Sequence, residues 1–126
     1  MAGWFEGYVS EDPEAAWPAV AKHAGHQINS YMRYAAESAG RPAAPPVDME
    51  DMRSRPIGKS LTYCLNGTPE DVARQIRAYT AGAPVESVFL WASLGGMPEA
   101  MVAEHVRLIC TRLAPLLADH HPVGAA

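Results

Sequence analysis

Three short apolar runs are each followed by a helix start, and this repeated order constrains the fold more than any other feature. The runs cover residues 4–9, 60–65 and 86–92 and are rich in the aromatic and branched residues that favour β-strands. Each is followed within a few residues by a proline with acidic neighbours, which is typical of the first turn of a helix. These prolines are Pro13, Pro69 and Pro98. Strands that alternate with helices pair in parallel through right-handed crossovers, so the sequence predicts the α/β class.

Apolar residues at spacings of three and four predict which face of each helix is buried. The first helix starts at Pro13 or, because an internal proline removes a hydrogen bond, only near Pro18, and it ends at Gly40. Its predicted buried positions are Trp17, Val20, Ala24, Ile28, Tyr31 and Ala35. Those of the second helix are Val72, Ile76 and Tyr79, and those of the third are Val102, Val106, Ile109, Leu113 and Leu116. Pro115 is expected to bend or end the third helix.

The 126 residues fit one domain, and residues 41–59 are predicted to form a long surface loop within it. This stretch contains several prolines among small and charged residues. Three strand–helix units are too few to close a (β/α)8 barrel, which needs eight units and ~250 residues. The chain is therefore expected to be either a small open α/β domain or part of a larger barrel.

Composition excludes several classes of function. A net charge of −4 and a pI near 5.7 argue against a nucleic-acid binder, and the basic residues form no run suited to an anionic membrane. The first residues lack the features of a signal peptide, and no stretch approaches the ~20 apolar residues of a membrane span. Cys64 and Cys110 follow no metal spacing and are expected to be buried, reduced thiols. We therefore expect a cytoplasmic protein.

Several segments match one known family in order and spacing. Residues 67–79 (GTPEDVARQIRAY) begin with a Gly-Thr-Pro-Glu helix start, and residues 88–98 combine an apolar strand with a glycine-containing loop. Residues 108–115 form a Leu-containing helix segment that ends near a proline, and residues 8–17 combine a strand, an acidic turn and Glu-Ala-Trp. Together these segments resemble the C-terminal part of the bacterial luciferase-like monooxygenases. The resemblance is weakest over residues 40–59.

The resemblance implies a partial (β/α)8 TIM barrel made of about the last three strand–helix units. It also implies an oxidoreductase that uses reduced FMN or the deazaflavin F420 at the barrel's C-terminal mouth and acts on a small-molecule substrate. In relatives, most groups that hold the flavin phosphate come from earlier strands, so we expect a truncated enzyme and assign no catalytic residue. Completing the barrel would require other copies, as a homo-oligomer, or a complementing chain.

The turn after the second run contains the candidates for cofactor binding. Asn66, Gly67 and Thr68 are expected to place backbone N–H groups at a helix N-terminus, which favours anions. The alternative interpretation is that Thr68 only caps its helix, since capping alone selects a Thr-Pro-Glu sequence. Both interpretations stay open at this stage.

The turn after the third run contains the candidates for substrate binding. These are Trp91, Ser93, Gly95 and Gly96. A glycine-containing turn lets a flat ring or a substrate approach the backbone closely. The alternative is a core tryptophan followed by a plain turn.

The histidines do not predict a metal site. His23 and His26 are three residues apart on one helix, but no third ligand stands at a suitable spacing, so surface positions are expected. His105 is likewise expected at the surface or in an interface, and residues 120–121 in a frayed tail.

Two alternatives to the oxidoreductase hypothesis remain, which are a non-catalytic α/β association module and a gene fragment derived from that family.

Overall fold

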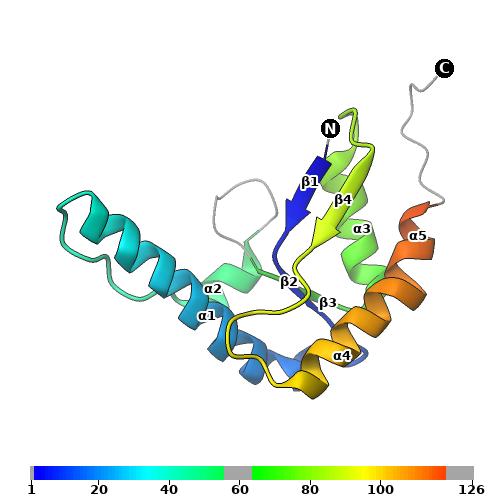
Figure 1. Cartoon of the computed structure of the whole chain (residues 1–126). Helices are drawn as coiled ribbons and strands as arrows, with labels where there is room; N and C mark the ends of the chain where they lie inside the picture. Colours follow the sequence, from blue (N-terminus) through cyan, green and yellow to red (C-terminus); the bar gives the residue numbers. More distant parts are fainter. Residues whose placement is uncertain (1, 56–63, 119–126) are drawn as a thin grey trace.

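The computed structural model of the chain describes residues 2–55 and 64–118, and Figure 1 shows their arrangement. The elements in chain order are β1 (Ala2–Phe5), β2 (Gly7–Val9), α1 (Pro13–Ser38), α2 (Met49–Ser54), β3 (Leu65–Gly67), α3 (Pro69–Thr80), β4 (Ser87–Leu90), α4 (Glu99–Leu108), η1 (Ile109–Leu113) and α5 (Ala114–Ala118). The predicted α/β class is confirmed. Most of the predicted second strand lies outside the described residues.

The first predicted strand is bent into two segments that pair on opposite sides. β1 pairs with β4 and β2 pairs with β3, and both pairings are parallel, as the sequence predicts. The carbonyl of Phe5 accepts from the N–H of Trp91, whereas the carbonyl of Glu6 accepts from the N–H of Leu65. Gly7 follows the bend, where a Cβ would lie only 2.5 Å from the Cβ of Leu65, so only glycine fits there.

Residues 2–9 therefore run between β3 and β4. In a (β/α)8 barrel, strands that follow one another in the chain are neighbours in the sheet. Within residues 2–55 and 64–118, however, β3 does not pair with β4. The observed order, with the first strand in the middle, is also the order at the switch point of open doubly wound sheets. The barrel accordingly remains a prediction.

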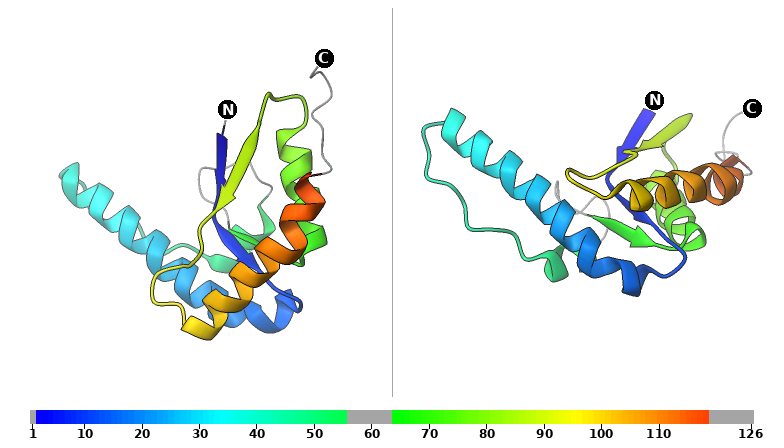
Figure 2. Two further views of the ribbon diagram at one scale, coloured as in Figure 1. Left: turned by 45° about the vertical axis from the view of Figure 1, so that its right-hand side comes forward. Right: turned by 60° about the horizontal axis from the view of Figure 1, so that its bottom comes forward.

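Each face of the strands carries its own apolar cluster, because successive strand residues point to opposite faces. On one face, Phe5 and Val9 pack with residues of α3, α4, η1 and β3; the other buried members are Leu65, Val72, Ala73, Ile76, Leu108 and Leu113. On the other face, Tyr8 packs with α1; the other buried members are Trp17, Val20, Ala24, Cys64 and Leu94. Figure 2 shows α1 and the pair formed by α3 and α5 on different sides of the strands.

Helix α1 begins at Pro13, capped by the side chain of Asp12, and Pro18 lies inside it, so the later start is wrong. Ala24 and Ile28 are buried as predicted, but Tyr31 and Ala35 are exposed, which corrects the second half of the predicted stripe. The reason is tertiary, since this half of α1 projects beyond the rest of the molecule (Figures 1 and 2).

The predicted loop at residues 41–59 is wrong in one part, because it contains the short helix α2. Asp48 caps α2 by accepting from the N–H groups of Glu50 and Asp51. Met52 is fully buried, and Glu50 accepts a bond from the indole N–H of Trp17. A capping aspartate, one buried methionine and the bond from Trp17 therefore help to hold a helical turn inside a segment rich in proline.

The C-terminal helix is continuous but changes its winding. The π-helical segment η1 separates α4 from α5 and lies just before Pro115, whose missing N–H interrupts normal α-helical bonding. The extra residue per turn rotates the buried face, so Leu108 and Leu113 are buried although they are five residues apart. The predicted position Val106 is 37% exposed, which corrects that part of the stripe.

Candidate functional site

Two strand-to-helix turns contain all the candidate residues. We call residues 66–69, which join the end of β3 to the start of α3, the first junction, and the turn from β4 to α4, residues 91–98, the second junction. Both follow the carboxyl ends of parallel strands, where α/β proteins bind ligands. The register places the end of β3 opposite Val9 and the end of β4 opposite Phe5, four residues apart, or ~13 Å along the strand. The two junctions thus lie at the carboxyl ends of the strands, but they are displaced from each other along the strand direction.

The first junction uses its polar groups internally. The amide of Asn66 donates to the carbonyl of Pro13 (3.2 Å), and the carbonyl of Gly67 accepts from the N–H of Ser10 (3.1 Å). Thr68 caps α3, because its hydroxyl accepts from the N–H of Asp71 (3.2 Å). The sequence placed Asn66 and Gly67 beyond the strand, but both lie within β3, so their backbone follows the sheet and not the helix N-terminus.

The first turn of α3 is acidic. Hydrogen bonds from Arg112 hold the pKa of Glu70 below its ordinary value, and those from Arg74 do the same for the pKa of Asp71. Both carboxylates are therefore ionised at neutral pH beside the N-terminus of α3. A phosphate group at this position would meet two negative charges, although Arg112 and Arg74 offset them in part.

Two buried polar atoms beside the first junction have no hydrogen-bond partner among the described residues. They are the hydroxyl of Ser10, whose side chain follows β2, and the amide oxygen of Asn66. Ser10 is only 6% exposed. Buried groups of this kind are normally bonded, so they represent unused hydrogen-bonding capacity at the carboxyl edge.

The second junction is longer and more open than the first. Trp91 is 53% exposed, and its ring meets the ring of Phe89 edge to face, with centroids 6.2 Å apart. A core tryptophan, one of the two interpretations of this position, is therefore excluded. Ser93, Gly95 and Gly96 are also exposed, while Leu94 between them is buried and anchors the turn.

Side chains of α1 hold the second junction in place. Gln27 accepts from the N–H of Gly95 (2.9 Å) and donates to the carboxylate of Glu6. The Nδ1–H of His23 donates to the carbonyl of Gly95 (3.2 Å), since a carbonyl can only accept. Burial raises the pKa of Glu6 above its ordinary value, and the bond from Gln27 opposes this. Gly96 adopts φ +76°, which side chains rarely allow.

His105 of α4 joins the two strand systems. Its Nδ1 accepts from the N–H of Val9 (2.9 Å), so Nε2 carries the proton and donates to the carbonyl of Trp91 (3.0 Å). The ring stacks on Tyr8 at 5.0 Å, and the hydroxyl of Tyr8 donates to the carbonyl of Met101 (3.0 Å). Beyond the end of β4 the chain leaves the strand next to it. The imidazole of His105 bonds to the N–H of Val9 and to the carbonyl of Trp91, which no longer pair with a neighbouring strand there.

His105 is 1% exposed, which corrects the expected surface position. Burial lowers its pKa below the ordinary value, so it is neutral at pH 7. Its spacing of four from Met101 and three from Leu108 would have placed it on an apolar helix face. The sequence therefore contains an apolar face through Met101, His105 and Leu108, but the face through Val102 and Val106 is more apolar and conceals it.

Metal ligands do not gather in the described part of the chain, where no group of three His, Cys, Asp or Glu side chains is suitably placed. Cys64 is buried, and burial raises the pKa of its thiol to about 12. Cys110 is exposed, so the expected burial of both thiols is wrong for this residue. Among residues 2–55 and 64–118, the helices fall short of the length and apolar character that crossing a bilayer requires.

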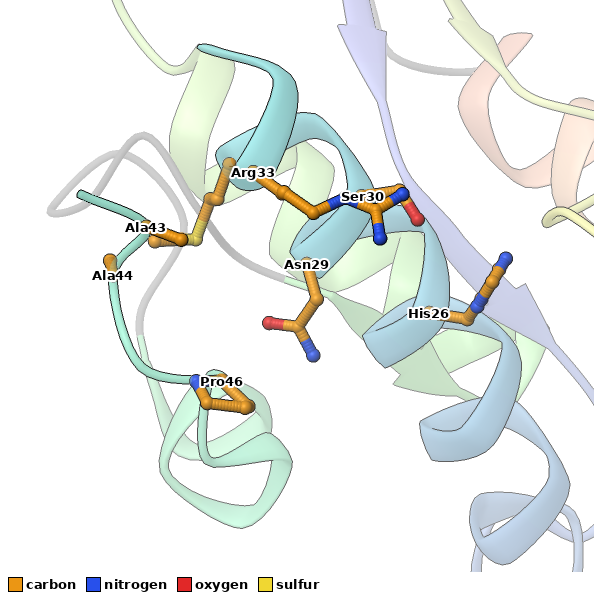
Figure 3. Close-up of a pocket in the computed structure, with 8 residues that line it drawn as sticks. His26, Asn29, Ser30, Arg33, Ala43, Ala44 and Pro46 are labelled. Atoms are coloured by element: carbon orange, nitrogen blue, oxygen red, sulfur yellow. The ribbon is translucent and has the colours of Figure 1, made fainter. Parts of the chain in front are cut away.

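A separate groove of about 320 Å³ lies between α1 and the segment that returns beside it (Figure 3). Its polar lining comes from His26, Asn29, Ser30 and Arg33, and its opposite wall from small residues and Pro46. Asn29 already accepts from the N–H of Val47 (2.9 Å), which ties the segment to the helix. The groove contains none of the predicted site residues.

Comparison of this chain with protein-family models and with curated proteins finds no match.

Proposed function

We propose that this chain forms one wall of the active site of a cytoplasmic flavin- or F420-dependent oxidoreductase of the luciferase-like type. Completing a (β/α)8 barrel would require further copies or a complementing chain. The proposal is supported by the resemblance of the ordered segments and by parallel strand–helix units whose carboxyl ends lie on one edge. The observation that carries it is the half-exposed Trp91 in the same turn as the exposed Gly95 and Gly96.

Trp91 is held in place without being covered. Its N–H donates to the carbonyl of Phe5 (3.4 Å), its carbonyl accepts from His105, and its ring packs edge-on against Phe89. A fixed aromatic face can stack on a flat ring without first losing conformational freedom. Trp91, Ser93, Gly95 and Gly96 are therefore proposed to contact the flat ring of the cofactor or the substrate.

The phosphate of FMN or F420 fits the first junction poorly. The amide N–H of Asn66 is used for α1, the carbonyl of Gly67 for the sheet and the hydroxyl of Thr68 for the helix cap, and two ionised carboxylates lie beside them. The amide oxygen of Asn66 is unbonded within the described part of the chain, but as an acceptor it cannot bind a phosphate oxygen. Ser10 directly follows β2, and its buried hydroxyl has no hydrogen-bond partner among the described residues. We therefore assign the phosphate to a complementing chain. When bound, the cofactor would supply the oxygenation or hydride transfer.

The test is a titration of the purified chain with FMN and with F420, followed by fluorescence, while light scattering records its mass. Saturable binding that Trp91→Ala weakens at least tenfold would support the proposal. The matched control is Tyr79→Ala. Tyr79 was predicted to be buried on α3 but is 53% exposed, the same fraction as Trp91. Absence of binding at high micromolar cofactor, alone and with candidate partner chains, would overturn it.

The second candidate is a non-catalytic association module. It is favoured by the internal use of the first junction and by the exposed aromatic residues on β4 and α1. Under this hypothesis the chain associates with a partner but binds neither cofactor, and Trp91→Ala changes association instead of cofactor affinity. The same titration, with mass recorded throughout, distinguishes the two functions.

A further inference from the structure

Two histidine rings bond to the second junction at two different points. His105 of α4 donates its Nε2–H to the carbonyl of Trp91 (3.0 Å), and His23 of α1 donates its Nδ1–H to the carbonyl of Gly95 (3.2 Å). Figure 1 shows the junction in yellow as it passes from β4 beside α1 to the start of α4. The beginning of the turn is thus bonded to one helix and its middle to the other.

The two rings respond differently to a proton. The Nδ1 of His105 accepts from the N–H of Val9 (2.9 Å), so this ring makes its bonds only while Nδ1 carries no proton. His23 donates through Nδ1, and a charged imidazole still carries a proton on that nitrogen. Protonation therefore destroys a bond of His105 but preserves the bond of His23.

The charged and titratable side chains around His105 offer its ring no counter-ion. They are Tyr8 of β2, Glu11 after it, Glu104 and Arg107 of α4, Arg112 of η1, and Glu6 and His23 on the side of α1. Glu104 bonds to Arg107, and Glu11 pairs with the arginines of α4 and η1. Glu6 accepts from Gln27, and residues 91–98 carry no charge. Within residues 2–55 and 64–118, no carboxylate bonds to the imidazole, which is 1% exposed, so a charged ring there would be buried and unpaired.

We propose that protonation of His105 releases the Trp91 end of the second junction, while the Gly95 end stays bound to α1. A charged ring would direct a proton towards the N–H of Val9, so the ring leaves its pocket and gives up the carbonyl of Trp91 as well. Residues 91–93 are already exposed and bury little surface that the release would uncover.

The other end stays attached through contacts that need no uncharged histidine. Leu94 is 2% exposed and belongs to the apolar cluster under α1. The carbonyl of Gly95 keeps the bond from His23, and its N–H keeps the bond to Gln27 (2.9 Å). The junction therefore contains a short flap, residues 91–93, whose opening leaves Leu94 and Gly95 in place.

The closed junction should predominate at neutral pH and the open one should gain in acid. Burial lowers the pKa of His105 below its ordinary value of 6.5, whereas a released ring lies in water and titrates near that value. The open state therefore binds the proton more tightly. As pH falls from 6.5 to the lowered value, the ratio of open to closed junction rises by up to tenfold per pH unit. This release does not rest on the oxidoreductase proposal, because it involves only protons and the chain's own residues.

Hydrogen exchange of two backbone amides, measured by NMR on the full chain between pH 7 and pH 5, tests the release. The N–H of Val9 bonds to His105 and the N–H of Gly95 bonds to Gln27, so each amide reports one end. After correction for intrinsic exchange, the protection of Val9 should fall at least threefold and that of Gly95 less than twofold. A parallel loss at buried Val72 would mean global unfolding and would overturn the proposal, as would constant protection of Val9.

A second measurement follows the ring of His105 directly. Its nitrogen resonances should show an unprotonated Nδ1 at pH 7, and the midpoint of its titration should coincide with the loss of protection at Val9. In His105→Gln, which does not titrate in this range, the protection of Val9 should no longer depend on pH. If the ring became charged while Val9 stayed protected, the proposal would be wrong even if the variant failed to fold.

Two histidine variants of α1 test the end that stays attached. His23→Ala should lower the protection of Gly95 at least threefold at every pH and leave the pH dependence of Val9 unchanged. The matched control is His26→Ala, an exposed histidine three residues further along α1, which should change neither amide. Equal effects of the two variants on Gly95 would overturn the role given to His23.

Discussion

The first and second junctions make the same strand-to-helix connection in different ways. One residue, Thr68, separates β3 from α3, whereas residues 91–98 separate β4 from α4. The short junction is stabilised by a local hydrogen bond, since the hydroxyl of Thr68 caps the helix that follows it. The long junction depends on distant side chains, namely Gln27 and His23 of α1 and His105 of α4. A turn built from distant contacts keeps its own side chains available for a ligand, so the comparison favours the second junction as the binding element.

The largest effect on this comparison is expected from His105→Ala. It removes a fully buried ring and leaves the N–H of Val9 and the carbonyl of Trp91 without partners. We expect a loss of about 3 kcal/mol in the free energy of unfolding, measured by chemical denaturation. The control Val106→Ala, on the exposed side of the same helix, should cost less than about 1 kcal/mol. Equal losses for the two variants would contradict the role given to His105.

The same histidine should make stability depend on pH. Since burial lowers the pKa of His105, its contribution is present above the ordinary value of 6.5 and is lost as pH falls through the lowered value. His105→Gln keeps an acceptor and a donor but does not titrate in this range. Denaturation between pH 7 and pH 5 should therefore show a smaller change for His105→Gln than for the unchanged chain.

The next largest effect separates two adjacent glycines of the second junction. Gly96 has φ +76°, so Gly96→Ala should cost 1–2 kcal/mol, about the usual penalty for a side chain in this region. Gly95 is the matched control, because a Cβ there would lie in ordinary contact, 3.5 Å from the oxygen of Gln27. Thermal denaturation of the two variants gives the answer. A Gly95→Ala variant as unstable as Gly96→Ala would contradict the assigned turn geometry.

At the first junction, Thr68→Ala should cost about 1 kcal/mol through loss of the helix cap. Thr68→Ser should retain most of the stability, because it keeps the hydroxyl that accepts from the N–H of Asp71. Denaturation measures the cap, and the FMN titration measures any ligand contact. If Thr68→Ser lowered cofactor affinity without lowering stability, the purely structural role of this junction would be wrong.

The smallest effect should come from the link between α1 and the second junction. Gln27→Ala removes the bonds to Gly95 and Glu6 and should cost about 0.5–1 kcal/mol. Faster hydrogen exchange confined to residues 91–98 would show that this side chain holds the turn.

The sequence by itself determined the alternation of strands and helices, the parallel pairing and most of the helix ends. Local chemistry suffices for these features: Pro13 and Thr68 begin helices because of their own backbone and hydroxyl, and Gly40 ends one at φ +62°. The turn after β4 was also placed correctly, since glycines and a proline mark it within one short segment.

Tertiary structure alone decided the strand order, the burial of His105 and the exposure of the second half of α1. Each depends on residues far apart in the chain: His105 bonds to Val9 across 96 positions, and Tyr31 is exposed because the strands end before the helix does. Periodicity identifies the apolar face of a helix but not which part of that face meets a partner. It also misses a change of winding such as η1, which rotates the buried face partway along a helix.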